Sequence, residues 1–268
     1  MRSFAILAAA CLCASVAGAE TAAVDDPPDL LLRAGLGYHY SSGDYGDREE
    51  TQIMYVPLII RGDIDAWTLE LTLPFIYIRG PSGILGVVDS NQNPNDDDIE
   101  SNQGPGDILL SAAYTLWPWW ERMPFLTATA RIKFPTASEN DGLGTGEFDY
   151  YVSGQAIWTA GDITPFIEIG YESLGDSSDV NLHDAVRVSS GLSYQLIDPL
   201  TAGISLDYGS PTSSSAGQRI DLVPFLSWTF LPSWSLAAYG SAGLASGSPD
   251  VGVGVQLSYN IYDSASRP

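Results

Sequence analysis

The chain has 268 residues, 45% of them hydrophobic, and a formal net charge of −22. Such an acidic surface repels the nucleic-acid backbone, so we expect no nucleic-acid partner. The hydrophobic content is too high for a disordered acidic chain, so a folded protein is expected.

Residues 1–19 are predicted to be a cleaved secretory signal peptide. Arg2 gives the start a positive charge, residues 4–16 form a short apolar core, and residues 17–19 (Ala-Gly-Ala) form a small-residue cleavage site. Residues 20–29 are then expected to be a short periplasmic segment. The protein is therefore expected to be exported from the cytoplasm.

Both cysteines, Cys11 and Cys13, lie inside this signal, so the mature chain has no thiol. A disulfide scaffold, a cysteine nucleophile and thiolate-bound zinc are thereby excluded. Beyond the signal, no stretch reaches the roughly 18 apolar residues of a transmembrane helix. Because only helices and closed barrels satisfy their backbone in lipid, an exported apolar chain of this kind points to a β-barrel.

From residue 30 onward, apolar residues alternate with small or polar ones at a period of two, which is typical of strands. A soluble sandwich would show the same alternation, but segments of roughly 9–11 residues also fit tilted strands that cross a membrane. We predict an all-β fold, a closed antiparallel up-and-down transmembrane barrel over 30–262, with a C-terminal tail at 263–268. About twelve strands are expected, at 30–40, 51–60, 67–77, 107–116, 126–134, 148–159, 165–174, 186–196, 201–209, 220–230, 234–244 and 251–261.

Connections and aromatic residues favour the barrel over the sandwich. Short turns alternate with longer loops, as periplasmic turns and extracellular loops do in outer-membrane barrels. All seven tryptophans lie near the ends with short turns. Two aromatic belts are expected at membrane interfaces, whereas a sandwich has no reason to sort its tryptophans. The second belt is predicted from Tyr38, Tyr40, Tyr77, Tyr150, Tyr151, Tyr171 and Tyr208.

Charged residues on the polar strand faces are predicted to point into the lumen. They would line a pore that filters solutes by charge, or form a static ion-pair network that plugs it. Twelve strands lie between the filled lumen of about 8 strands and the aqueous channel of about 16, so both interpretations stay open. Arg131 and Lys133 would form a basic constriction opposed by Asp107 and Asp149. The candidates are Arg33, Glu70, Asp107, Arg131, Lys133, Asp149, Glu168, Arg187, Asp207, Arg219 and Asp221.

One Ser–His motif is a candidate catalytic site. His39 and Ser41 lie at the rim of the first strand, and Glu49 or Glu50 would supply an acid, as in lipid A deacylases of the outer membrane. Ser42 stands where those enzymes have Asn. A rim histidine without catalysis is the preferred interpretation, so no enzyme is expected.

The acidic loop 79–106 contains oxygen side chains at the spacing of a calcium-binding loop. Pro94 replaces the central glycine of that motif and no helices flank it, so a flexible acidic loop is preferred. We expect no resident cofactor or metal, only loose association of divalent cations near lipid head groups. The weak calcium candidates are Asp89, Asn91, Asn93, Asn95, Asp97 and Glu100.

Three segments carry a resemblance to a known family. Residues 104–114 (GPGDILLSAAY), 130–137 (ARIKFPTA) and 143–149 (LGTGEFD) are similar in order and spacing to segments of the outer-membrane transporters associated with the meta-cleavage pathway of phenol degradation (MetA-pathway of phenol degradation family). Ala137 stands where the family has Gly. The resemblance implies a barrel of roughly twelve strands and uptake of hydrophobic or aromatic compounds.

The sequence thus predicts an outer-membrane channel that passes a small solute by passive diffusion. Its expected surroundings are outer-membrane lipid, lipopolysaccharide and the barrel-insertion machinery. The alternatives are a lipid-modifying enzyme and a structural or adhesive barrel with a plugged lumen and 79–106 as its contact loop. The solute, the oligomeric state and an inward fold of 79–106 stay open.

Overall fold

The computed structural model describes residues 30–45, 50–81, 99–120, 122–175, 182–214 and 216–264. The strands are β1 (Leu31–Gly43), β2 (Thr51–Ile64), β3 (Trp67–Pro81), β4 (Ile99–Pro105), β5 (Ile108–Leu116), β6 (Phe125–Phe134), β7 (Asp149–Ile157), β8 (Ile163–Ser173), β9 (Ala185–Ile197), β10 (Leu200–Gly209), β11 (Arg219–Leu231), β12 (Trp234–Gly243) and β13 (Val251–Asp263). Within these residues, we find no helix with the length and apolar character needed to cross a membrane.

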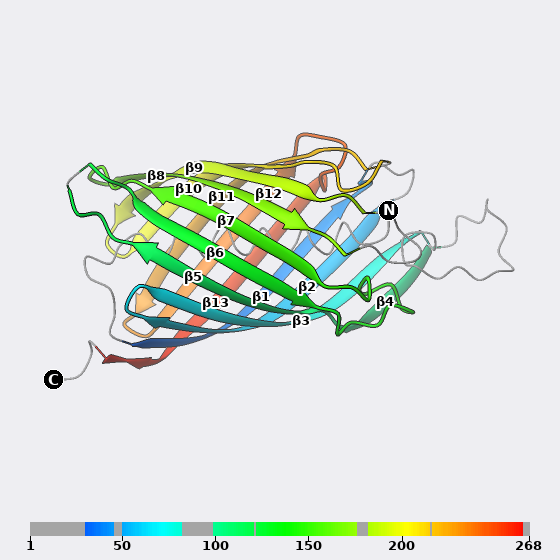
Figure 1. Cartoon of the computed structure of the whole chain (residues 1–268), viewed down its shortest axis with the longest axis horizontal. Helices are drawn as coiled ribbons and strands as arrows, with labels where there is room; N and C mark the ends of the chain where they lie inside the picture. Colours follow the sequence, from blue (N-terminus) through cyan, green and yellow to red (C-terminus); the bar gives the residue numbers. More distant parts are fainter. Residues whose placement is uncertain are drawn as a thin grey trace, which may run out of the picture.

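Twelve of the strands close into an antiparallel barrel (Figure 1). Pairing runs in chain order from β5 to β13, β13 pairs with β1, and the pairs β1–β2, β2–β3 and β3–β5 complete the circle. The predicted all-β barrel is confirmed. We call the end with short turns periplasmic and the end with long loops extracellular, as in outer-membrane barrels.

The extra strand, β4, corrects the prediction of one long loop over 79–106. The first half of β3 pairs with β5 as far as Thr72↔Leu109, and its second half pairs with β4 from Phe75↔Pro105 onward. The β3–β4 hairpin thereby extends beyond the barrel rim (Figure 1). The alternation fails to reveal β4 because this strand lies outside the apolar band, so neither of its faces has to be apolar.

The two faces of each barrel strand differ as the alternation predicts. On β13, Val251, Val253 and Val255 are about half exposed, whereas Gly252 and Gly254 between them are buried. A register slip of one residue would turn the valines inward, so the alternation fixes the pairing. The exposed apolar face is the surface that hydrocarbon covers in a membrane.

The aromatic belts largely follow the prediction. Trp67, Trp119 and Trp120 are among the most exposed large side chains, and they lie at the periplasmic end. Tyr38 and Tyr150 are exposed near the extracellular end. Tyr151 is the exception, because its hydroxyl donates a hydrogen bond to Glu168 on the inner wall.

The two ends of the barrel sequence meet at the periplasmic rim. The Leu30 amide donates to the Ser264 hydroxyl at 3.0 Å, and the Ser264 amide donates to the Leu30 carbonyl at 3.0 Å. These bonds continue the β1–β13 pairing to the last described residue.

Candidate solute pathway in the barrel lumen

The inner wall carries all the charged residues that the sequence assigned to it. Ten of them lie on the buried or half-buried face of a strand, and Asp107 lies directly before β5 in phase with its inward positions. Their role as a pore lining stays a prediction. The residues are Arg33, Glu70, Asp107, Arg131, Lys133, Asp149, Glu168, Arg187, Asp207, Arg219 and Asp221.

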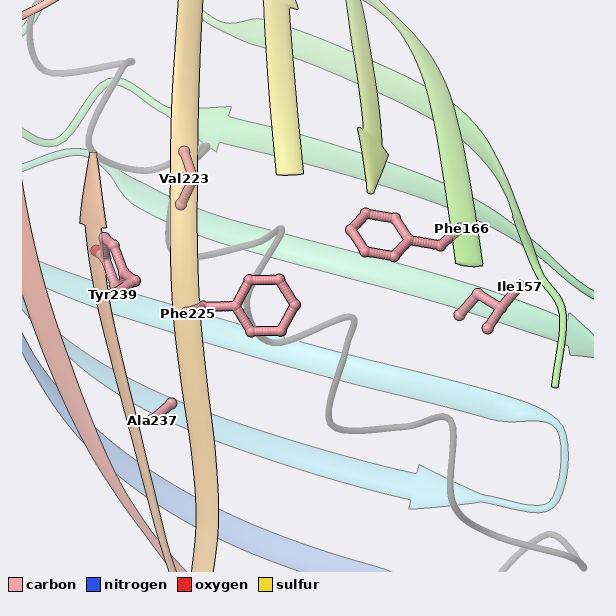
Figure 2. Close-up of a cluster of buried hydrophobic side chains, with 6 residues drawn as sticks. All are labelled: Ile157, Phe166, Val223, Phe225, Ala237 and Tyr239. Carbon is pink, nitrogen blue, oxygen red and sulfur yellow. The ribbon is translucent and has the colours of Figure 1, made fainter. Parts of the chain in front are cut away.

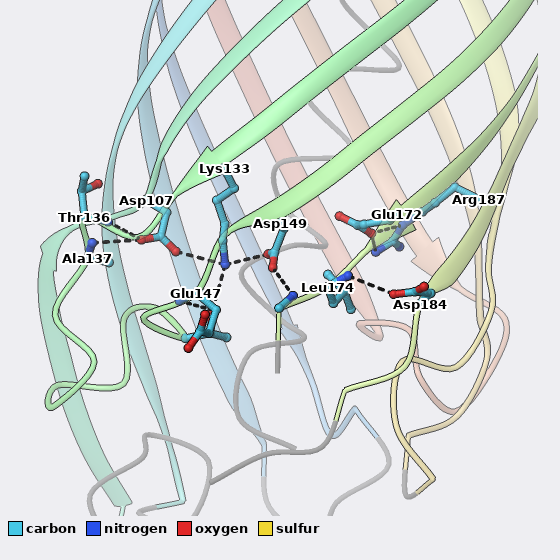
Figure 3. A network of polar contacts seen from close by, with 12 residues as sticks. Asp107, Lys133, Thr136, Ala137, Glu147, Asp149, Glu172, Leu174, Asp184 and Arg187 are labelled. Atoms are coloured by element: carbon cyan, nitrogen blue, oxygen red, sulfur yellow. Dashed lines mark hydrogen bonds and ion pairs between the residues drawn. The ribbon is translucent and has the colours of Figure 1, made fainter. Parts of the chain in front are cut away.

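One ionic cluster is a lysine clasp of Asp107, Lys133 and Asp149 at the extracellular ends of β5, β6 and β7 (Figure 3). The Lys133 ammonium lies 2.6 Å from Asp149 Oδ2 and 3.3 Å from Asp107 Oδ2. It also donates to Thr145 Oγ1 at 3.0 Å. Lys133 is the sole lysine of the chain. A buried ammonium needs such partners, since burial alone would penalise its charge.

The carboxylates of the clasp also hold the loops beside them. Asp107 Oδ1 accepts hydrogen bonds from the amides of Thr136 at 3.0 Å and Ala137 at 2.9 Å. Asp149 Oδ1 accepts one from the Gly175 amide at 2.9 Å. Each carboxylate thus joins the lysine to a loop backbone, and charge-assisted bonds of this kind are the strong ones.

The three segments that carry the family resemblance converge at this clasp. They supply Asp107, Lys133 and Asp149 respectively, together with the loop between β6 and β7. A Cβ on Gly144 would lie 3.0 Å from Asp107 Oδ2, so a glycine there lets the loop backbone approach the carboxylate. The sequence analysis expected Lys133 to face Asp107 and Asp149, and the register of β5, β6 and β7 brings the three side chains together.

Above the clasp, the same loop contributes to an apolar mouth cluster. Leu143 packs against Ile53 and Tyr55 of β2 and Ile76 and Ile78 of β3, and all five are buried. Tyr45 and Ala137 pack around this cluster. The cluster links β2 and β3 to the β6–β7 loop, so it reaches between strands that are not neighbours.

The other ion pairs run along the wall. Arg187 contacts Glu172 on the neighbouring strand at 2.6 Å, and Arg219 pairs with Asp221 on its own strand. At the periplasmic end, Arg33 and Arg61 both lie 2.9 Å from Asp63. Each of these six ion pairs joins positions on, or directly beside, the same or adjacent strands, so none of the six crosses the lumen.

Three of these partners, Arg61, Asp63 and Glu172, escaped the sequence prediction. The signal was present. Arg61 and Asp63 continue the inward phase of β2 beyond residue 60, where the predicted strand ended, and Glu172 follows Glu168 on the inward phase of β8.

The basic constriction of Arg131 and Lys133 stays a prediction, and the structure gives the two cations different contacts. Lys133 is held between two carboxylates, whereas the Arg131 guanidinium lies 5.0 Å from the centre of the Tyr151 ring. Tyr151 in turn donates to Glu168 Oε1 at 2.8 Å. The two cations therefore belong to separate contacts. Asp207 accepts a bond from the Ser189 hydroxyl at 2.5 Å, and Glu70 lies opposite Arg61 in the register of β2 and β3.

An aromatic cluster lies deeper in the lumen (Figure 2). Phe166 of β8 and Phe225 of β11 point toward one another in Figure 2, although β9 and β10 separate their strands. A Cβ on Gly191 would lie 2.8 Å from Phe166 Cζ, and one on Gly203 would lie 2.2 Å from Phe225 Cζ. The rings thus lie over glycines of the intervening strands. The cluster consists of Ile157, Phe166, Val223, Phe225, Ala237 and Tyr239, with Phe125 packed against it.

Comparison with known families agrees with this arrangement. The family described as "Putative MetA-pathway of phenol degradation" matches residues 59–261, which is more than half of the chain and includes the whole clasp. The chain belongs to this family. No curated protein matches the sequence.

Solved structures place this family member among outer-membrane barrels. An outer-membrane channel from Pseudomonas putida F1 shares 14% identity at a TM-score of 0.71, over 88% of this chain and 98% of that chain. The translocator domain of the autotransporter NalP from Neisseria meningitidis shares 11% identity at a TM-score of 0.59, over 96% and 98%. Likeness at such identities establishes the fold, so the chain has the fold of an outer-membrane β-barrel.

The residues of the catalytic alternative do not form a Ser–His pair in this family member. His39 is buried, and its Nδ1 lies 3.1 Å from the Tyr239 hydroxyl. Ser41 Oγ instead lies 2.9 Å from the Tyr45 hydroxyl. A nucleophilic serine needs its base within hydrogen-bond reach, and here each residue is bonded to a different tyrosine. Glu50 accepts from Ser42, and Glu49 lies outside the described residues.

Several predictions concern parts of the chain that the structure does not describe. The signal peptide at 1–19 and the segment 20–29 are outside the described residues, as are Asp89, Asn91, Asn93, Asn95 and Asp97 of the calcium candidate. Glu100 lies on β4. Among the described residues, no group of three or more His, Cys, Asp or Glu side chains is placed to hold a metal ion.

Proposed function

We propose that this barrel is a passive channel for small apolar or aromatic solutes. The observation that carries the proposal is the difference between apolar and ionic contacts inside the barrel. The mouth cluster and the aromatic cluster reach between strands that are not neighbours, whereas the described ion pairs stay along the wall. An ion passing apolar side chains loses its hydration at a high cost, and an apolar solute does not.

The family supports this direction. The family's description links it to phenol degradation, and the similar solved structure from Pseudomonas putida F1 is an outer-membrane channel. The net charge of −22 would also repel anions from the mouth. Neutral solutes are therefore favoured over aromatic carboxylates. Outer-membrane lipid, lipopolysaccharide and the barrel-insertion machinery are the partners that this location implies.

The test is uptake by intact Gram-negative cells, because lipopolysaccharide rather than phospholipid limits the entry of apolar solutes. Cells that produce the barrel should take up radiolabelled toluene several-fold faster than cells without it, and benzoate at an unchanged rate. Phe225→Asp should abolish the gain, since it places a charge inside the aromatic cluster. Equal toluene uptake with and without the barrel would refute the channel. Unchanged lipid A mass spectra in the same cells would argue against a lipid-modifying enzyme.

A further inference from the structure

Tyr45 occupies an unusual position for a loop residue. It follows β1 by two residues, and its φ of 50° lies in the left-handed region that a tyrosine rarely adopts. Its ring packs against the mouth cluster, and its hydroxyl lies 2.9 Å from Ser41 Oγ. Strained backbone persists only where the surroundings hold it. The contacts of this one side chain must therefore compensate for its backbone.

The seat of the Tyr45 ring is apolar, with hydrogen-bonding groups at its edge. Ile53, Ile76 and Ile78 are almost completely buried, and Ser41 is 2% exposed. Thr51, two residues before Ile53 on the same inward face, has a buried hydroxyl with no hydrogen-bond partner among the residues that the structure describes. An apolar slot with few, fixed polar groups is the usual form of a small-molecule site. A ring that carries a hydroxyl group fits this pattern, and the tyrosine side chain is such a ring.

The seat also favours the neutral form of that hydroxyl. Burial raises the pKa of Tyr45 from 10.0 to about 12, and the carboxylates of Asp221 and Asp250 add to the effect, while the Ser41 bond and Arg219 oppose it. A phenol in this environment would stay protonated, and a phenolate would be disfavoured.

We propose that the seat formed by Ser41, Ile53, Tyr55, Ile76 and Ile78 is a binding site for small neutral phenols, with Tyr45 as its internal occupant. An incoming phenol takes the place of the Tyr45 ring, and its hydroxyl replaces that of Tyr45 on Ser41. The released Tyr45 backbone is then free to leave its strained conformation. An unsubstituted ring gains only the apolar contacts, so the site discriminates by the hydroxyl. This inference rests on the proposed function, because it names the solute class that the channel admits first.

The experiment is a fluorine NMR titration of the folded mature barrel in detergent with 4-fluorophenol and with fluorobenzene. Tyr45→Ala empties the seat, so 4-fluorophenol should bind about tenfold more tightly than to wild type, where Tyr45 competes. Fluorobenzene should bind Tyr45→Ala about tenfold more weakly than 4-fluorophenol. Adding Ser41→Ala should erase that preference. Tyr38→Ala, on the outer face of β1, is the matched control and should behave as wild type.

Equal 4-fluorophenol affinity of wild type and Tyr45→Ala overturns the proposal, and so does equal binding of the two ligands to Tyr45→Ala. If that variant does not fold, Tyr45→Phe is the alternative, because it keeps the ring and frees the Ser41 hydroxyl. This variant should bind 4-fluorophenol several-fold more tightly than wild type. An unchanged affinity for 4-fluorophenol overturns the proposal as well. If cells with the barrel take up toluene but the Tyr45 variants bind 4-fluorophenol no more tightly than wild type, the site is refuted and the channel is not. If the variants bind 4-fluorophenol more tightly but cells with the barrel take up no additional toluene, the channel is refuted and the site is not.

Discussion

Replacing Lys133 with Met should lower the free energy of unfolding by most of the amount that breaking a buried ion pair typically costs. The side chains of Lys133, Asp107 and Asp149 are only 10%, 10% and 5% exposed, so removing the cation leaves two carboxylates that water reaches poorly. Such a loss typically amounts to about 3–5 kcal/mol. Asp107 keeps two amide donors, each worth roughly 1.5–3 kcal/mol to a charged group. We therefore expect the low end, about 3 kcal/mol.

Urea-dependent unfolding of the barrel in lipid vesicles measures this free energy directly. The matched control is the triple variant Lys133→Met, Asp107→Asn and Asp149→Asn, which removes the buried charges together with their attraction and should recover most of the loss. Arg131→Met, at the next inward position of β6, removes a cation–π contact with Tyr151 and should cost less than Lys133→Met. A loss under about 1 kcal/mol for Lys133→Met, or a triple variant as unstable as the single one, would refute the clasp as a buried network.

Three further outcomes are expected. Lys133 should resist amine acetylation in the folded barrel and react after denaturation. Mass spectrometry measures the acetylation of this residue directly, because Lys133 is the sole lysine of the chain. Rapid labelling of the folded protein would show that the clasp is open. Gly203→Ala should destabilise by about 1–3 kcal/mol in urea unfolding, since its Cβ would meet Phe225, whereas Gly154→Ala meets nothing within 4 Å and should be neutral. Tyr45 should ionise near pH 12, so its stabilising contribution is complete below pH 10.0 and is lost between the two values. An ultraviolet difference titration against Tyr45→Phe checks this, and a midpoint at 10 would contradict it.

The strands could be predicted because lipid imposes one rule on the outer face, which is that its side chains are apolar and alternate with small or polar inner ones. Where the inner face is polar or small, as at Gly252 and Gly254, the alternation gives both the strand and its orientation. On β2 and β3 the rule fails, since Ile53 and Ile76 are apolar and point inward. Nothing in the local sequence says what covers them.

The candidate site was predicted in part. Lys133 was expected to face Asp107 and Asp149, whereas the contacts of Tyr45 were not predicted. The phase of each strand placed Lys133 and Asp149 on the wall, but only the register between strands shows that they form one ion pair. Tyr45 lies in a segment whose sequence indicates a loop, and its place in the mouth depends on Ser41 and on residues of β2 and β3. Long-range packing of this kind is not encoded in the local sequence.

The hydrogen bonds between Leu30 and Ser264 have a practical consequence for protein engineering. Because the two ends already touch, a short linker could join them, and new termini could be opened in the turn between β9 and β10 on the same side of the membrane. Such a circular permutant would keep all twelve barrel pairings while changing the order in which the strands leave the export machinery. Its yield of folded protein would reveal whether assembly depends on the natural first and last strands.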